Sequence, residues 1–169
     1  YLGTEVKNHP LIGKFNYFAL NKMDLGGLDP NSCNYIYHKY LNHDFDLLGS
    51  GWKNMNKDKN KSLYRNIDWH KDIISGFTFN KKIWYKKISN TALKGVDIKG
   101  PWELGRLQHL PQLAIFAKLN LKKANEAINE FKNQIIDFDD NNLPRFGVHW
   151  SCTMDVAIRV ANILAAYDM

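Results

Sequence analysis

Hydrophobic residues recur at helical spacing in the C-terminal part of the chain, from about residue 100 onward. Within residues 122–140 they fall at intervals of three and four, the spacing that places side chains on one face of an α-helix. The predicted buried face comprises Ala124, Ala127, Ile128, Phe131, Ile135 and Phe138. A last helix is expected to begin near Ser151, because serine is a favourable N-cap residue. Its predicted apolar face comprises Val156, Val160, Ile163 and Leu164.

Residues 97–113, DIKGPWELGRLQHLPQL, predict a helix that does not run straight. Pro101 suits the first helical position, because the N–H that proline lacks would have no partner there. Pro111 cannot donate to the carbonyl of Leu107, so the helix is expected to kink there, or to end and restart. In the helix beyond it, the side chains expected to face the core are Leu113, Phe116, Ala117 and either Leu119 or Ile115.

The N-terminal half has a less regular pattern. A short helix is expected over residues 31–41, packed by Tyr35, Ile36 and Leu41. The lysine- and asparagine-rich residues 52–66 are expected to form a loop. An irregular segment is expected to follow, anchored by Trp69, Ile73, Phe77 and Phe79. Together the patterns predict one domain with a mainly all-α fold. It is built from antiparallel helical hairpins and has long irregular aromatic-rich loops in the N-terminal half.

Composition and charge indicate a folded protein with a basic surface. Hydrophobic residues make up 44% of the 169 residues, which excludes global disorder. The net charge is +6, and much of the excess lies in the lysine-rich residues 53–61 and 80–87, which are typical of solvated surface. A basic surface also suits a polyanion, either nucleic acid or an acidic polysaccharide. Because no recognition-helix motif occurs, nucleic acid is not the expected partner.

The sequence gives little support for a metal site, a disulfide framework, a hydrolase site or a membrane span. Cys33 and Cys152 are too few for a disulfide framework and are expected to be small buried side chains. Five residues of the N-terminal half match no compact metal motif: His43, Asp44, Asp46, Asp68 and His70. No metal and no cofactor is therefore expected. The chain also lacks a G-x-S-x-G motif and any apolar run of the ~20 residues that a membrane span needs.

A candidate sugar-binding cluster lies in the segment around Pro111. Trp102, Arg106 and His109 are spaced by four and three residues, which places them on one helical face. An indole stacks on a sugar ring, a guanidinium binds a carboxylate or sulfate, and an imidazole moves a proton near neutral pH. Glu103 lies at the edge of this face and can orient Arg106. The alternative is structural: a core tryptophan, a Glu–Arg helix pair and a histidine at a helix end.

A second candidate cluster lies at the start of the last predicted helix. His149 and Trp150 precede its N-terminus, where anions bind favourably. Asp155 lies near the positive end of the helix, and Arg159 follows it at the spacing of an i, i+4 ion pair. The alternative is a helix cap in which Trp150 packs back onto the helix and His149 faces water.

Four segments, taken in order, resemble the N-terminal helical region of the heparinase II/III-like proteins. They are HDFDLLGSG (43–51), IDWHKDIISGFTF (67–79), DIKGPWELGRLQHLPQLA (97–114) and GVHWSCTMDVAIRVANILAAYD (147–168). One such match alone is weak, and the specificity comes from four matches in order over most of the chain. The family includes polysaccharide lyases that act on heparan-type chains and on alginate.

The resemblance implies an (α/α) toroid, followed in the full protein by a β-sandwich domain. Residues 1–169 would form the first part of the toroid, and the rest of the toroid and the sandwich would lie outside this chain. The implied reaction is β-elimination on a uronic acid. It needs a group that neutralises the carboxylate, a base that takes the C5 proton and an acid for the leaving oxygen. The family's catalytic Asn-His stretch is expected beyond residue 169, so this chain alone is expected to be inactive.

The same resemblance implies an acidic polysaccharide as partner and a bacterial periplasmic or secreted location, with a cytoplasmic location as the alternative. The residues expected to form the substrate-facing wall are Trp102, Glu103, Arg106, Gln108, His109, His149, Trp150, Asp155 and Arg159. The family pattern has Asn where this chain has His149, which puts a specific hydrogen bond at that position in doubt. The alternative function is a non-catalytic carbohydrate-binding or scaffold domain with the same helical fold. The sequence does not indicate an oligomeric state.

Overall fold

Helices dominate the computed structural model, which describes residues 25, 27–57, 64–88 and 93–169. The helices are α2 (Pro30–Leu41), α3 (Lys99–Gly105), α4 (His109–Leu119), α5 (Ala124–Asn141) and α6 (Thr153–Asp168). Two 3₁₀ turns accompany them, η3 (Tyr85–Lys87) and η4 (Val148–Trp150). Strands β1 (Asp44–Phe45) and β2 (Lys53–Asn54) form a two-stranded antiparallel sheet. The prediction of a mainly α-helical fold is confirmed.

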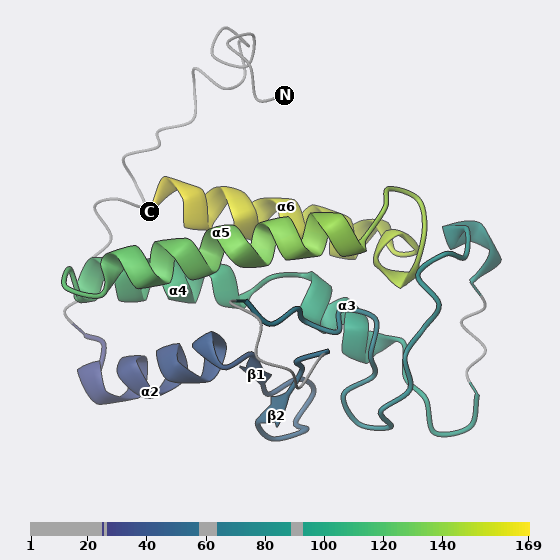
Figure 1. Cartoon of the computed structure of the whole chain (residues 1–169), viewed down its shortest axis with the longest axis horizontal. Coiled ribbons are helices and arrows are strands. Elements are labelled where there is room, and N and C mark those ends of the chain that lie inside the picture. The colour runs from purple at the N-terminus through teal and green to yellow at the C-terminus, as the bar shows by residue number, and fades with distance from the viewer. Residues whose placement is uncertain (1–24, 26, 58–63, 89–92) are drawn as a thin grey trace, which may run out of the picture.

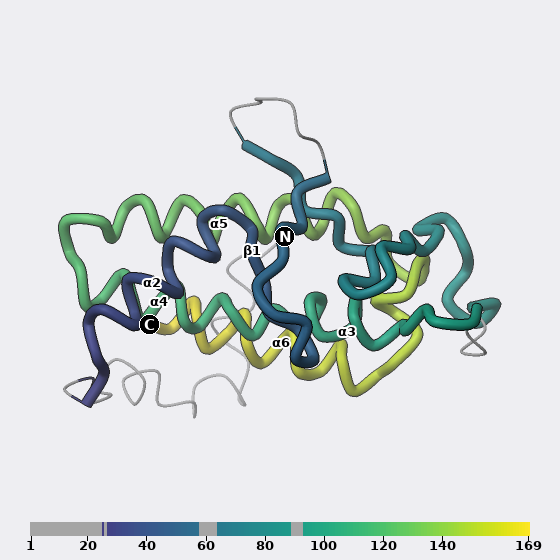
Figure 2. The backbone as a smooth tube through the Cα atoms, turned by 90° about the horizontal axis from the view of Figure 1, so that it is seen from below, coloured from purple at the N-terminus to yellow at the C-terminus, as the bar shows by residue number. Residues whose placement is uncertain are grey.

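Helix α4 lies at the centre of the arrangement and packs against α2, α5 and α6. A short connection over residues 120–123 turns the chain back, so that α5 runs antiparallel to α4. Helix α6 then returns alongside α4 (Figures 1 and 2). In Figure 1, α2 lies on the opposite side of α4 from α5 and α6. Between α2 and α3 the described residues form short strands, turns, isolated bridges and the 3₁₀ turn η3, but no α-helix.

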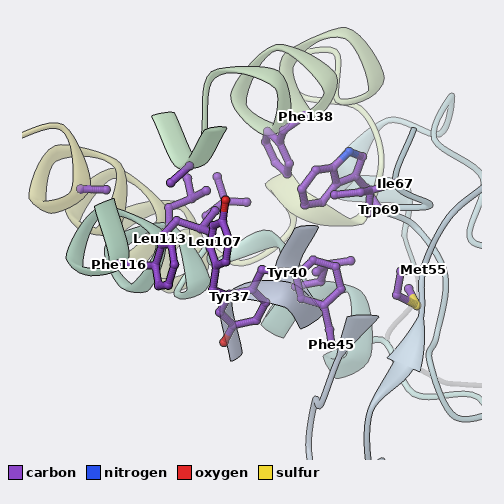
Figure 3. Close-up of a cluster of buried hydrophobic side chains, with 14 of the residues drawn as sticks. Tyr37, Tyr40, Phe45, Met55, Ile67, Trp69, Leu107, Leu113, Phe116 and Phe138 are labelled. Carbon is purple, nitrogen blue, oxygen red and sulfur yellow. The ribbon is translucent and has the colours of Figure 1, made fainter. Parts of the chain in front are cut away.

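The hydrophobic core joins α2, α4 and α5 to the chain between α2 and α3 (Figure 3). Tyr37 stacks on Phe116, with the ring centroids 3.6 Å apart. Trp69 meets Phe138 edge to face at 5.1 Å. Side chains that are distant in the sequence therefore bury one another, and burial of aromatic area is the largest stabilising contribution such residues make.

Helix α2 packs Ile36 and Leu41 against the core as predicted, but the predicted Tyr35 does not face inward. Asp29 caps its N-terminus by accepting hydrogen bonds from the backbone of the first turn, and Pro30 occupies the first position. Tyr37 and Tyr40 are buried, whereas Tyr35 is 54% exposed. The reason is that α4 supplies aromatic and amide partners on the other side, and Tyr40 donates to the side chain of its Gln112.

The break in the 97–113 segment falls earlier than Pro111. Leu107 has a left-handed backbone with φ of 56°, which is uncommon for a residue with a bulky side chain. Helix α4 starts two residues later, so Pro111 lies in its first turn, where no intrahelical donor is needed. Trp102 belongs to α3 and His109 to α4. The prediction that Trp102, Arg106 and His109 share one helical face is therefore wrong.

Helix α5 buries polar side chains in addition to most of the apolar ones that were predicted. Four predicted core positions do lie inward, Ala127, Phe131, Ile135 and Phe138. Ile128, however, is 41% exposed. Glu130, Gln134 and Asp137 are buried instead. Burying such groups is tolerated because each has a hydrogen-bond partner on a neighbouring segment.

Helix α6 is also rotated relative to the prediction. Asp155, Arg159 and Ala166 are buried, whereas Val160 and Leu164 are 50% and 60% exposed. Of the predicted apolar stripe, Ile163 packs against the core, whereas Val160 and Leu164 do not face it. The partners that α3 and η4 offer to the two charged residues hold the polar face inward, since a buried charge without a partner is costly.

Several single residues also differ from their predicted places. Pro101 is the third residue of α3, not the first. The hydroxyl of Ser151 donates to a carbonyl of η4, and α6 begins two residues later without a side-chain cap. Phe77 is exposed. Cys33 and Cys152 are half-buried free thiols, not fully buried side chains.

Candidate functional site

Arg106 joins α3 to the first turn of α6. Its Nε donates to Asp155 Oδ1 at 2.6 Å, and its Nη1 donates to Glu103 Oε1. Asp155 is 1% exposed, so the guanidinium neutralises a carboxylate that water does not reach. Burial opposes the charge of Arg106, but the hydrogen bonds and charges of the two carboxylates outweigh it and raise the pKa of Arg106. The predicted pairing of Glu103 with Arg106 is confirmed, and Asp155 is an additional partner.

Arg159 lies one turn further along α6 and is buried. Its Nε donates to Gly105 O at 2.5 Å, and its Nη2 donates to His149 O at 3.0 Å. The guanidinium carbon lies 4.5 Å from the ring centroid of Phe138. Burial lowers the pKa of Arg159 to about 10, and the charge of Asp155 acts in the opposite direction. Among the described residues these carbonyl contacts replace the predicted ion pair between Asp155 and Arg159.

His149 is enclosed in the interior. Its Nε2 lies 2.9 Å from Trp69 O, and its ring centroid lies 5.0 Å from that of His70. Gly105 packs directly on the imidazole: a Cβ there would overlap Nδ1 and lie 2.6 Å from Cε1. Burial lowers the pKa of His149 well below its usual value, and the charges of His70 and Arg159 act in the same direction. The alternative in which His149 faces water is therefore wrong.

His109 begins a chain of buried polar side chains under α4. Its Nε2 lies 2.5 Å from Gln134 Oε1. The amide of Gln134 donates to Glu130 Oε1 at 2.6 Å, and His43 Nε2 lies 2.9 Å from the same oxygen. The other ring nitrogen of His43 lies 2.6 Å from Asn56 Oδ1. His109 therefore belongs to the core and does not contact Arg106 or Trp102 across a shared face.

We expect protonation of His109 to destabilise the fold as the pH falls. Burial lowers its pKa to about 4, opposed by the bond to Gln134 and assisted by the charge of His43. Between pH 6.5 and about 4 the unfolded chain binds the proton and the folded chain does not, so stability is lost as the pH falls. A single such group contributes roughly 1.4 kcal/mol per pH unit. Urea unfolding between pH 7 and 5 should show a shallower dependence for His109→Gln than for the parent chain.

His38→Gln is the matched control for that measurement. His38 is exposed in α2 and is not part of this buried chain of polar side chains, so the variant controls for the loss of a histidine as such. Equal slopes for His109→Gln and the parent chain would contradict the assignment of His109 as a neutral core residue.

Asp137 anchors the second of the four segments to α5. Its Oδ2 accepts from Ile67 N at 2.8 Å and from Trp69 Nε1 at 3.0 Å. Its Oδ1 accepts from the Asn141 amide at 2.8 Å. Burial raises the pKa of Asp137, although these hydrogen bonds favour the ionised form. Both Trp69 and the end of α5 are thereby held in fixed positions.

The remaining predicted site residues lie nearer the surface. Trp102 is half-buried, and its Nε1 donates to Val148 O at 2.9 Å. Trp150 is half-buried, and its Nε1 donates to Asn142 O at 3.2 Å. Gln108 is exposed at the break between α3 and α4. Both indole N–H groups therefore contact backbone, and most of the nine predicted residues brace α3 against η4 and α6.

A cavity of about 470 Å³ lies next to this braced region, at the C-terminal end of α5. Its lining includes Lys57, Asp68, His70, Phe79, Lys81 and Asn141. Lys81 Nζ donates to Asn141 Oδ1 at 2.9 Å, and His70 Nε2 lies 3.3 Å from Asn141 O. None of the nine predicted wall residues lines it. The volume falls within the range of about 300–1,000 Å³ that is typical of small-molecule sites.

Sequence reasoning missed the polar face of α5. Glu130, Gln134, Asp137 and Asn141 follow one another at intervals of four, three and four, which is the helical period. This polar stripe is visible in the sequence, but it reads as a solvated face unless its partners are known. The cavity lysines carried no local signal, because Lys81 and Asn141 are 60 residues apart.

The described residues contain no group of three or more His, Cys, Asp or Glu side chains placed to hold a metal ion. His43 pairs with Glu130 and His70 with the backbone of Asn141, so the histidines of the first two segments have separate partners.

In the part of the chain that the structure describes, no helix combines the length and apolar character needed to cross a membrane. Comparisons with protein-family models, with curated proteins and with solved structures found no match to this chain.

Proposed function

We propose that this chain forms the first part of an (α/α) toroid in a heparinase II/III-type polysaccharide lyase. In the full protein the reaction is β-elimination on an acidic polysaccharide. The ligand class follows from the four-segment resemblance and is consistent with the chain's positive charge.

The observation that carries the proposal is that all four resembling segments pack together as one unit. Phe45 of the first segment meets His109 of the third edge to face at 4.8 Å. Asp72 of the second accepts from the backbone of Asp97 in the third at 3.1 Å. His149 of the fourth segment contacts the backbone of the second, as described above. Segments that resemble one region of one family thus share a single set of buried contacts.

The exposed side of α6 supports a toroid with further helices. Val160, Leu164 and Tyr167 lie on one flank of α6 and are at least half exposed. A contiguous apolar stripe on a helix is typical of a surface that another element covers. In the proposed toroid this flank packs against the next helical hairpin of the same polypeptide.

The proposal divides the chemistry between this chain and the rest of the protein. Most of the predicted wall residues here brace the fold, so they position the cleft and do not transfer protons. The carboxylate-neutralising and proton-transferring groups are assigned to residues beyond 169. This chain alone is accordingly expected to bind but not to cleave.

The full-length gene product should cleave at least one uronate polymer. Elimination leaves a double bond in the new sugar end, so the product absorbs ultraviolet light and the original polymer does not. Heparan sulfate and alginate are the first substrates to test, with a neutral glucan and the isolated 1–169 chain as negative controls. An absence of absorbance on every uronate would contradict lyase activity.

A non-catalytic carbohydrate-binding or scaffold role is the second candidate, favoured by the predominance of structural contacts among the predicted site residues. It predicts polysaccharide binding by the full-length protein without product formation, so the same assay combined with a binding measurement separates the two.

A further inference from the structure

The cavity at the end of α5 has walls that main-chain hydrogen bonds hold in place. Residues 70 and 79 face each other in a tight hairpin, where Phe79 N donates to His70 O at 2.9 Å. Lys71 and Thr78 form an isolated antiparallel bridge in the same hairpin. Elsewhere in the lining, Ile67 N donates to Asp137 Oδ2. Such a cavity is largely formed before a ligand arrives, which lowers the entropic cost of binding.

Its charged groups favour an anion. Lys57 and Lys81 supply two ammonium groups and Asp68 one carboxylate, and the lining carries no other formal charge when His70 is neutral. Burial lowers the pKa of His70, and the charges of both lysines add to that effect. Neither lysine forms an ion pair with any described residue. The carboxylate of Asp68 is engaged within the protein, because its Oδ2 accepts a hydrogen bond from the Thr78 hydroxyl at 3.1 Å.

The orientation of Lys81 is restricted by Asn141. An ammonium has three donors, and one of them is engaged by Asn141 Oδ1 at 2.9 Å. Asn141 is itself fixed, since its amide donates to both the side chain and the backbone of Asp137. Two donors of Lys81 are left for a ligand, on a side chain whose position is already set.

The rest of the lining suits a sugar. Asn80 and Thr78 add amide and hydroxyl groups, and Phe79 contributes aromatic surface. Sugar rings combine apolar C–H faces with hydroxyls, so they bind where aromatic surface and hydrogen-bonding side chains lie together. The combination differs from a purely electrostatic patch, which would lack the aromatic wall.

We propose that this cavity binds a carboxylate-bearing sugar unit of an acidic polysaccharide. Lys81 and Lys57 contact the carboxylate, and Phe79 contacts the ring. The ligand class rests on the proposed function, but the site does not depend on catalysis, so the two are tested separately.

Titration calorimetry of the 1–169 chain at low salt tests the site, with an alginate hexasaccharide as the probe. We expect measurable binding that Lys81→Ala weakens about tenfold, because charge-assisted hydrogen bonds are lost. Lys57→Ala should weaken it as well, and it serves as the second variant because Lys57 is exposed and its truncation does not disturb the core. Lys82→Ala is the matched control: Lys82 adjoins Lys81, is exposed and does not line the cavity.

Four results would overturn the site. One is an equal loss of affinity in Lys82→Ala, which would mean diffuse surface charge. Another is equal binding of cellohexaose, a neutral oligosaccharide. The third is the absence of Lys81-dependent binding, and the fourth is tighter Lys81-dependent binding of a single-stranded DNA oligomer. If the full-length protein cleaves the polymer equally well with and without Lys81→Ala, the lyase proposal stands and the proposed site is wrong. If binding depends on Lys81 but the full-length protein does not cleave, the proposed site stands and the lyase proposal is wrong.

Discussion

Arg106→Ala is expected to lower the free energy of unfolding by about 3–5 kcal/mol, the range found when one partner of a buried ion pair is removed. Asp155 is 1% exposed, and Arg106 supplies its charged partner at 2.6 Å. Without the guanidinium the buried carboxylate loses its hydrogen-bonded partner and keeps only the longer-range charge of Arg159. Glu103 loses its partner too, but it is more exposed and loses less. Urea unfolding followed by circular dichroism measures the change.

Two further variants make that result specific. Arg106→Lys keeps a positive charge but not the two-carboxylate geometry, so it should retain part of the stability. Arg65→Ala removes an exposed arginine and should change stability by no more than about 0.5 kcal/mol. If Arg106→Ala unfolds like the parent chain but binds polysaccharide more weakly, then Arg106 faces the substrate and the structural account of it is wrong.

Gly105→Ala is expected to destabilise the fold by about 3 kcal/mol, the upper part of the usual range for overpacking. A Cβ at this position would overlap the imidazole of His149, which is 0% exposed and held by Trp69 O at 2.9 Å. Alanine is otherwise favoured over glycine inside a helix, by about 1 kcal/mol. A loss of stability would therefore report the steric conflict alone. Thermal or urea unfolding of the variant gives the magnitude.

A control variant and a double variant test whether the loss of stability comes from the contact with His149. Gly27→Ala should be nearly neutral, since a Cβ there meets no atom of the described residues within 4 Å. In a His149→Ala background the cost of Gly105→Ala should fall sharply, because the side chain it strikes is gone. An undiminished cost in that background would place the conflict elsewhere.

The helices were predictable because periodicity is a local property. The 122–140 pattern locates α5, and the residues that follow Ser151 locate α6. Which face of each helix is buried was not predictable in the same way. Val160 and Leu164 are more apolar than Asp155 and Arg159, yet the charged pair lies inside, because carbonyls and a second arginine from α3 and η4 meet it there.

In the candidate site, too, short-range contacts were predictable and long-range contacts were not. The Glu103–Arg106 contact spans three residues and was predicted from spacing alone. The cavity was not, because it joins Lys81 to Asn141 and His70 to the end of α5 across 60 and 71 residues. The positive net charge and the resemblance both pointed to a polyanion, but the predicted wall residues are different side chains from those that line the cavity.

The polar inner face of α5 has a consequence for how the chain folds. The α4–α5 hairpin contains mostly local contacts and is expected to form early. The partners of Glu130 and Gln134 come from His43 and His109, and the contact between Glu130 and His43 spans 87 residues, so it closes late. Until then water hydrates the carboxylate of Glu130 in the hairpin. An apolar face in the same place would be free to associate with other unfolded chains, so the stripe that specifies the core is also expected to reduce aggregation before the core closes.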